Sequence, residues 1–168
     1  GIDIIRIFDA LNDVRNLEVA IDEANKQGAH ASGTICFTTS PVHTLEKNVQ
    51  MVKELKSMGV QSICIKDMAA LLTPYETEGL VRDLKQAVSI PVQLHTHYTS
   101  GLASMCIMKG VEAGVDVVDT AMSPLALGTS HAPTESIVAA LQGTEYDTGL
   151  DLVLLNEIRE YFMGLRKK

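Results

Sequence analysis

The sequence lacks several features that would assign it at once to a class of protein. Basic residues are in deficit, with 14 Lys and Arg against 21 Asp and Glu and a net charge of −7, which argues against binding to nucleic acid or to an anionic membrane surface. No apolar run approaches the length of a membrane span. The cysteines, Cys36, Cys64 and Cys106, are odd in number and widely separated, so they exclude a disulfide framework or a zinc knuckle and indicate reduced, buried thiols in a cytoplasmic protein.

What the sequence does contain is an alternation of short apolar runs with amphipathic helical patterns. The runs are typical of buried strands and begin near residues 4, 31, 62, 91 and 115. This alternation predicts parallel βα units in an α/β fold, arranged either as a doubly wound sheet or as part of an eight-stranded barrel. No Gly-x-Gly-x-x-Gly turn follows the first strand, which removes the main support for a dinucleotide-binding sheet. The 168 residues contain no linker or low-complexity stretch, so we expect a single segment.

Local signals set the expected limits of three helices. Ser40 followed by Pro41 predicts an N-cap and a first helical residue. Thr73 and Glu76 have the spacing of a capping box at the start of the next helix. A last amphipathic helix is expected over residues 151–168, where the final basic residues suit the negative end of the helix dipole.

Polar residues collect where the expected strands end. In parallel βα folds the carboxyl ends of the strands lie at one edge of the sheet, and binding sites form there. The residues at these ends are Asp9, Thr38, Thr39, Lys66, Asp67, His95, His97, Asp119 and Thr120. This concentration of polar side chains predicts a functional site at that edge.

Two histidines of this set, His95 and His97, lie two residues apart at the end of a strand. Side chains two apart on a strand share a face, so both imidazoles should point the same way. Two imidazoles in this arrangement supply half of a metal site. A lone His-x-His is more often a pair of surface histidines that satisfies loop backbone, and it is the surrounding polar residues that favour the metal site here.

Lys66 is the unexpected residue of the set, because it continues an apolar strand into the group of polar strand ends. It has two explanations, an ion pair with Asp67 or Asp9, or membership of the metal site. A protonated lysine offers no lone pair and is repelled by a cation. If Lys66 belongs to the metal site, its charge must therefore be removed chemically.

Four stretches taken together resemble the carboxyltransferase domain of biotin-dependent enzymes. They are residues 6–12, 65–69, 94–97 and 117–121, and the combination of Ile-Lys-Asp-Met with His-x-His is the most specific part. The family comprises the α subunit of oxaloacetate decarboxylase, the matching subunits of transcarboxylase and of two-subunit pyruvate carboxylase, and single-chain pyruvate carboxylase. Its fold is a (β/α)8 TIM barrel. The resemblance implies that this chain is the later part of such a barrel, about five parallel βα units with a C-terminal helix.

The resemblance also implies a metal centre. Lys66 would be carbamylated, which turns a cation into an anionic oxygen ligand. With His95 and His97 it would bind a divalent metal, zinc in the first place, with manganese or cobalt as alternatives. The fourth ligand of the family is an aspartate on its first strand, outside the part that this chain resembles. In the family the metal stabilises the enolate of pyruvate while carboxyl passes between oxaloacetate and biotin.

A hydroxyl that carries a proton between the enolate and biotin is implied as well. Thr129 falls in register with a threonine of the family, so it is the candidate catalytic and substrate-binding residue, and capping of the next helix is its alternative role. Biotin would be carried on another domain or subunit. Met108 and Lys109 are similar to the biotinylated motif, but they lie in a helical pattern and not at a hairpin tip.

Four functions are open at this point. The first is biotin-dependent carboxyl transfer of the oxaloacetate decarboxylase α-subunit type, and the second is the same transfer in a pyruvate carboxylase carboxyltransferase subunit. A Claisen-type metal-dependent lyase or synthase also uses His-x-His, but it does not resemble the strand that carries Lys66. A non-catalytic fragment is the fourth, because five strands cannot close a barrel and the isolated segment should be inactive. We expect a cytoplasmic homo-oligomer, free or held at a membrane by partner subunits, that works with a biotin carrier domain.

Overall fold

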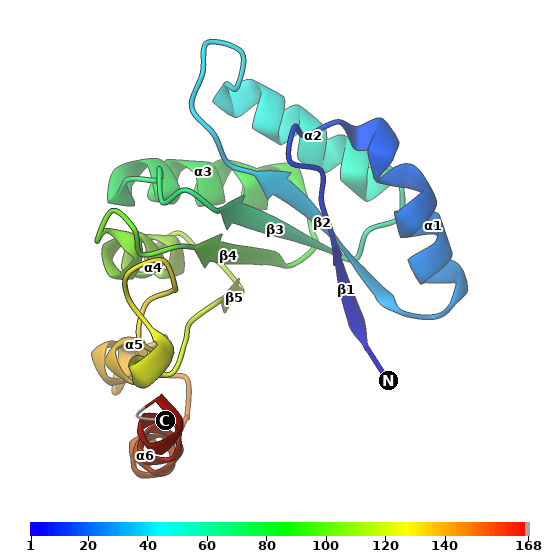
Figure 1. The fold of residues 1–168 in the computed structure, drawn as a ribbon. Coiled ribbons are helices and arrows are strands. Elements are labelled where there is room, and N and C mark those ends of the chain that lie inside the picture. The colour runs from blue at the N-terminus through cyan, green and yellow to red at the C-terminus, as the bar shows by residue number, and fades with distance from the viewer. Residues whose placement is uncertain (167–168) are drawn as a thin grey trace.

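The computed structural model describes residues 1–166 and shows one parallel sheet with helices (Figure 1). The strands lie in the order β1-β2-β3-β4-β5, with bounds β1 (Ile4–Ile7), β2 (His30–Cys36), β3 (Ser62–Asp67), β4 (Val92–Thr96) and β5 (Val117–Val118). The α-helices are α1 (Glu18–Lys26), α2 (Leu45–Ser57), α3 (Pro74–Ala87), α4 (Ala103–Glu112), α5 (Thr134–Leu141) and α6 (Leu152–Arg166), and the 3-10 turns are η1 (Val14–Asn16) and η2 (Ser123–Leu125). The predicted α/β fold is confirmed. Lys167 and Lys168, which end the last predicted helix, lie outside the described residues.

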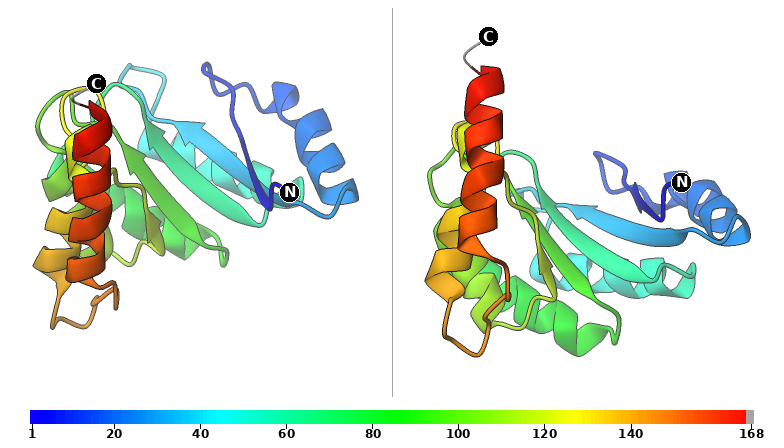
Figure 2. Two further views of the ribbon diagram at one scale, coloured as in Figure 1. Left: turned by 60° about the horizontal axis from the view of Figure 1, so that its bottom comes forward. Right: turned by 90° about the horizontal axis from the view of Figure 1, so that it is seen from below.

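The sheet has one face that is covered by helices and one that is not (Figure 2). Neighbouring residues of a strand point to opposite faces. In β4, Val92 and Leu94 are buried against the helices, whereas Gln93 and His95 point to the uncovered face and are partly exposed. The helix-covered face holds the apolar core, whose fully buried side chains include Ile35, Leu55, Ile63, Ile65, Leu84, Leu94 and Ile107. The apolar side chains whose burial stabilises the fold and the polar side chains of the strands thus lie on different faces of the sheet.

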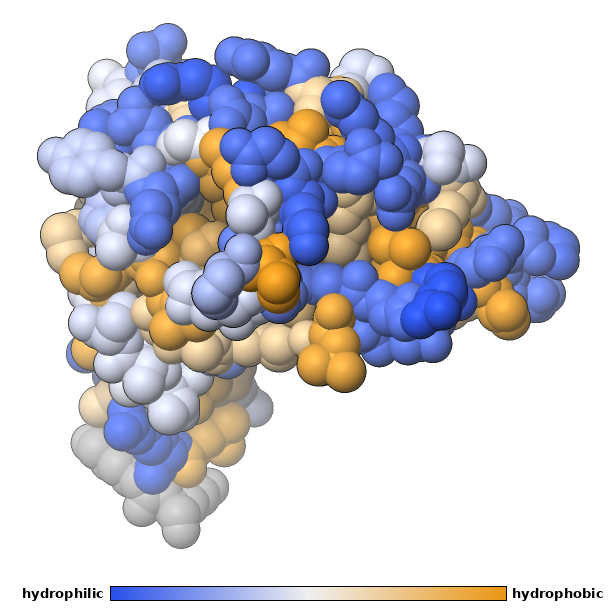
Figure 3. Space-filling view, turned by 90° about the horizontal axis from the view of Figure 1, so that it is seen from above, coloured by the Kyte–Doolittle hydropathy of each residue, from blue (hydrophilic) through white to orange (hydrophobic). Residues whose placement is uncertain are grey.

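The outer strands of the sheet, β1 and β5, each pair on one side only. Large hydrophobic side chains are exposed near β1, at Ile2 and Ile4, and on α6, at Val153 and Tyr161. Figure 3 shows a mixed face from above, on which hydrophilic residues alternate with hydrophobic ones. Within the described residues, no helix is long and apolar enough to cross a membrane.

The structure tests three of the predicted element limits. The prediction that Ser40 and Pro41 start a helix is wrong, because Thr44 caps α2 and Ser40 instead accepts a hydrogen bond from the Val42 backbone N–H within a turn. The capping box at α3 is confirmed, since the Glu76 carboxylate accepts the Thr73 backbone N–H at 3.1 Å. The fifth apolar run, expected to begin near residue 115, has regular pairing only at Val117 and Val118.

Candidate metal centre

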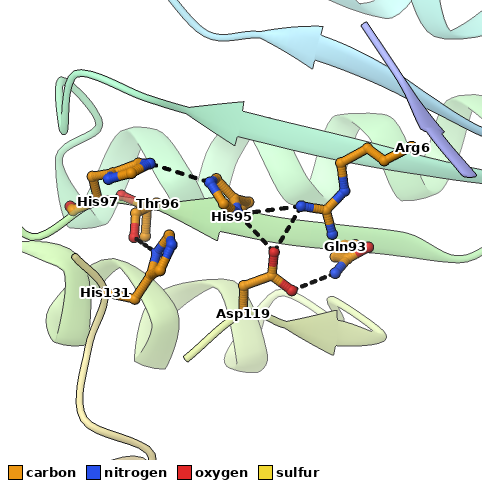
Figure 4. Close-up of polar contacts among 7 residues, drawn as sticks. All are labelled: Arg6, Gln93, His95, Thr96, His97, Asp119 and His131. Carbon is orange, nitrogen blue, oxygen red and sulfur yellow. Dashed lines mark hydrogen bonds and ion pairs between the residues drawn. The ribbon is translucent and has the colours of Figure 1, made fainter. Parts of the chain in front are cut away.

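Part of the predicted set of polar strand ends lies together on the uncovered face of the sheet, namely Lys66, His95, His97 and Asp119, whereas Asp67 points to the opposite face. Lys66 and His95 are directly paired across β3 and β4, and in a parallel sheet paired residues point to the same face. Arg6 reaches over from β1, and Asp119 follows β5 (Figure 4). Although β1 and β5 are opposite edges of the sheet, the Arg6 Nη1 and Asp119 Oδ2 atoms lie 2.9 Å apart. The sheet is therefore curled strongly enough for its two outer strands to share one site.

Three imidazoles come together at this site. His95 and His97 share a face, as predicted, and their Nε2 atoms are 3.3 Å apart. His131, from the loop after η2, completes the group, with its ring centre 4.4 Å from that of His95 and 4.6 Å from that of His97. One ring nitrogen of each histidine lies within 4.8 Å of the corresponding atoms of the other two. The spacing of ligand atoms fits a single metal ion.

Each imidazole is oriented through its Nδ1 atom. His95 Nδ1 lies 2.6 Å from Asp119 Oδ2, His97 Nδ1 lies 2.6 Å from the Thr129 carbonyl oxygen, and His131 Nδ1 lies 2.8 Å from the Thr96 carbonyl oxygen. Carbonyl and carboxylate oxygens can only accept, so each Nδ1 carries the proton and donates it. The lone pair of each neutral ring is then on Nε2. This is the arrangement that metal-binding histidines adopt, in which an oxygen acceptor fixes the tautomer and the free nitrogen faces the metal.

The Asp119 carboxylate contacts both the His95 ring and the positively charged Arg6 guanidinium. Burial alone would raise its pKa, but hydrogen bonds from His95, Arg6 and Gln93 outweigh burial and hold the pKa well below its ordinary value. Arg6 Nη1 also lies 3.2 Å from His95 Nδ1, but that nitrogen already donates to Asp119, so the guanidinium proton goes to the carboxylate. Asp119 is therefore ionised, and it strengthens His95 as an electron-pair donor.

His131 is held in the neutral form that a ligand requires. Burial lowers its pKa, and the neighbouring His95 and His97 lower it further, whereas the hydrogen bond to the Thr96 backbone acts in the opposite direction. The net effect is a lowered pKa, so the ring keeps a free lone pair at neutral pH.

Lys66 has no anionic partner among the described residues. Its ammonium lies 3.8 Å from the centre of the Phe8 ring. The Asp67 carboxylate is fully buried and accepts the backbone N–H groups of Leu71 and Leu72 and the Thr96 hydroxyl, and Asp9 accepts N–H groups of its own loop. The ion pair offered as an alternative for Lys66 is thus wrong, because both carboxylates are engaged in other hydrogen bonds.

Thr129 contributes its backbone and not its hydroxyl to the contacts of this centre. Its carbonyl oxygen accepts from His97, while its side chain is exposed. The alternative role of Thr129 as a cap for the next helix is wrong, because α5 begins after Pro133 without a side-chain cap.

The three thiols are not ligands of this centre. Cys36, Cys64 and Cys106 are buried and free, as predicted. Burial raises the pKa of each thiol, and that of Cys64 reaches about 12. Protonated thiols of this kind are inert as nucleophiles and poor as ligands.

Sequence reasoning missed His131 as a member of the cluster. His131 is 34 positions after His97 and belongs to no local motif that includes His95 or His97. The available signal was a third histidine shortly after Thr129, in a loop that the resemblance already placed at the site. Arg6 and Asp119 were in resembling stretches, but only the curl of the sheet shows that they touch.

A curled parallel sheet with consecutive strands side by side and an imidazole cluster at the carboxyl ends is the arrangement of part of a βα barrel with a candidate metal centre. Comparison with models of known protein families identifies the family to which this domain belongs. The chain belongs to the HMGL-like family, whose model matches residues 8–161.

Named relatives agree with the resemblance. A pyruvate carboxylase subunit of Methanocaldococcus jannaschii is 63% identical over the whole chain, which spans 30% of that protein. The methylmalonyl-CoA carboxyltransferase 5S subunit of Propionibacterium freudenreichii subsp. shermanii is 47% identical over the whole chain and 34% of its own length. The carboxyl transferase domain of Rhizobium etli pyruvate carboxylase, solved with pyruvate, superimposes with a TM-score of 0.97 at 38% identity, over 99% of this chain and 29% of that one. The predicted family and the partial TIM barrel are confirmed.

Proposed function

We propose that the protein transfers carboxyl between biotin and pyruvate, as the carboxyltransferase component of a biotin-dependent carboxylase. The chain spans about 30% of the length of the first curated relatives, which are named as subunits of pyruvate carboxylase. The observation that carries the proposal is the group of three oriented imidazoles at the carboxyl edge of the sheet. The oxaloacetate decarboxylase type uses the same exchange in the opposite direction. The relatives reported above carry carboxylase and carboxyltransferase names, so we place the pyruvate carboxylase type first.

The residues present fit a divalent cation. Two unprotonated Nε2 atoms that face each other at 3.3 Å repel unless a cation lies between them. Tetrahedral zinc with Zn–N bonds of about 2.05 Å places its nitrogen ligands about 3.3 Å apart, so this spacing suits zinc, and tetrahedral cobalt would fit it equally. His95 and His97 would hold the ion, together with a carbamate on Lys66. When bound, the ion would polarise the oxygens of the 2-keto acid as a Lewis acid.

The remaining polar residues of the site would orient these groups. Asp119, held by Arg6 and Gln93, keeps His95 in one tautomer and one direction. Lys66 lies beside His95 in register and is free of carboxylate partners among the described residues, which supports carbamylation, since a lysine in an ion pair would have to break it first. We further propose that the biotin carrier lies outside residues 1–168 and that the protein works in the cytoplasm as a homo-oligomer.

Thr129 remains our candidate for the hydroxyl that moves a proton between the enolate and biotin, and this role rests on the resemblance alone. Replacing Thr129 by Ala should lower turnover by about 100-fold or more while Thr129→Ser keeps it, because proton transfer by a positioned group contributes on this scale. Metal content should not change in either variant, because the backbone carbonyl that orients His97 remains. Full turnover in Thr129→Ala would remove its hydroxyl from the mechanism.

The function is tested by biotin-dependent decarboxylation of oxaloacetate. The whole metal-loaded protein is assayed for pyruvate release with and without added free biotin. We expect a biotin-dependent rate that is lost in His97→Ala and kept in His30→Gln, a control at the opposite end of the sheet where the His30 ring hydrogen-bonds to the Ser62 hydroxyl. A rate that does not respond to biotin, or that survives in His97→Ala, would overturn the proposal.

A further inference from the structure

His131 lies outside the set of ligands considered so far, yet it is tied to the same strand as His95 and His97. Its Nδ1 atom donates to the carbonyl oxygen of Thr96, the residue between the other two histidines. Any movement of β4 therefore carries all three rings together. Fixing the donor on Nδ1 directs the unprotonated Nε2 atom of His131 toward the other two rings (Figure 4).

The loop that carries His131 is built to hold this position. The Leu127 backbone N–H donates to the His131 carbonyl oxygen at 2.9 Å, and the Tyr98 N–H at the end of β4 donates to the Ser130 carbonyl oxygen at 2.7 Å. Leu127 and Gly128 both have left-handed backbone conformations, with φ of 66° and 57°. Leucine rarely adopts this conformation, so the surrounding contacts impose it. The strained turn places His131 over the edge of the sheet.

We infer that His131 is a third imidazole ligand of the metal, so that His95, His97 and His131 hold the ion through their Nε2 atoms. This inference rests on the proposed function, because it concerns the ligands of the same metal centre. Three neutral nitrogens bind a divalent cation without any contribution from Lys66. The carbamate then adds an anionic ligand to an ion that is already held, and does not create the site.

The alternative is that His131 stands beside the ion and binds only substrate or solvent. The two roles differ in the number of imidazoles bonded to the metal. In a cobalt-loaded protein each bound ring has its Nδ1 proton close to the paramagnetic ion, and the hydrogen bonds to Asp119, Thr129 and Thr96 slow exchange of these protons with water. The number of strongly shifted, exchangeable imidazole N–H signals therefore counts the ligands.

The experiment compares the whole protein with its His131→Gln, His95→Ala and His30→Gln variants after removal of metal and loading with Co²⁺. We expect three shifted N–H signals in the parent and in His30→Gln, and two in His131→Gln. Competition with a chelator should show Co²⁺ binding weakened by about tenfold or more in His131→Gln, with or without bicarbonate.

The failures of the two proposals can be told apart. An unchanged signal count and unchanged affinity in His131→Gln, with binding lost in His95→Ala, would overturn the role of His131 and keep the metal centre. Unchanged Co²⁺ binding in both His131→Gln and His95→Ala would overturn the metal centre itself. Circular dichroism of each variant separates a lost ligand from a lost fold.

Discussion

The two faces of the sheet differ in what they hold. On the helix-covered face, Ile35, Ile63 and Leu94 are fully buried, whereas the uncovered face carries Arg6 on β1 and His95 on β4. The apolar face stabilises the fold by burial, at about 25 cal/mol for each Å² removed from water. The polar face keeps groups that lower stability. Among the described residues, the hydroxyls of Ser32 and Thr34 are buried there without hydrogen-bond partners. Because successive side chains of a strand point to opposite faces, the residues that stabilise the fold are separate from those of the candidate metal centre. A substitution on one face should therefore leave the other face unchanged.

The largest effect should come from a cavity under the helices. Ile65 is fully buried and adjoins Lys66 in the chain but points to the opposite face. Ile65→Ala should lower the free energy of unfolding by about 2–5 kcal/mol, measured by urea denaturation, while the folded protein keeps its metal affinity. Cys64→Ala, a smaller change on the other face, is the matched control. Loss of metal affinity in the folded Ile65→Ala protein would show that the two faces are not independent.

The next effect concerns the carboxylate behind His95. Asp119→Asn removes the charge but keeps the size, and should weaken metal binding by about 10- to 100-fold with little change in fold. The pKa of Asp119 lies below its ordinary value of 3.8, so its stabilising contribution is present above that pH and is lost as pH falls toward the lower folded pKa. Unfolding curves between pH 6 and about pH 2 should therefore be less pH-dependent in Asp119→Asn. Equal pH dependence in both proteins would contradict the assigned contacts.

A smaller effect is expected at Lys66. Removing bicarbonate should lower metal retention by about tenfold in the parent protein and not in Lys66→Ala, because only a carbamate responds to bicarbonate. Lys109→Ala is the control, since Lys109 forms ion pairs with Glu112 on α4 and Glu78 on α3 and with no residue of the centre. Metal content that ignores both bicarbonate and Lys66→Ala would exclude carbamylation and leave Lys66 over the Phe8 ring.

The smallest effect should be a gain in stability. Thr34→Val replaces a buried hydroxyl that has no hydrogen-bond partner within residues 1–166 by a methyl group of the same shape, and should raise the free energy of unfolding by up to about 1 kcal/mol. Thermal unfolding measures the change, and Thr77→Val is the contrast, because the Thr77 hydroxyl donates to the Thr73 carbonyl oxygen. Destabilisation by Thr34→Val would show that the hydroxyl has a partner on the uncovered face.

The sequence was sufficient for features that depend on local periodicity. The shared face of His95 and His97 follows from the two-residue repeat of a strand, and the capping box of Thr73 and Glu76 from fixed spacing. The start of α2 was misplaced, because Ser40 and Thr44 are both suitable caps and the choice depends on how the loop meets the sheet.

The missed parts of the site depend on tertiary structure. His131 reaches the centre through a turn in which Leu127 adopts a conformation that leucine rarely has, and no propensity predicts that. The contact between Arg6 and Asp119 depends on the curl of a whole sheet. Periodicity tells which face a side chain occupies but not how far the face bends.

The bridge between Arg6 and Asp119 joins groups that are 113 positions apart in the chain. Contacts with such long sequence separation form late in folding, after the strands between them have paired, because the loop entropy must be overcome first. Arg6 also holds the Asp119 carboxylate that orients His95, so the full set of these contacts is complete only when that bridge has closed. The centre is therefore assembled last, and under the proposed function a partly folded chain would hold its metal ion less tightly than the finished protein.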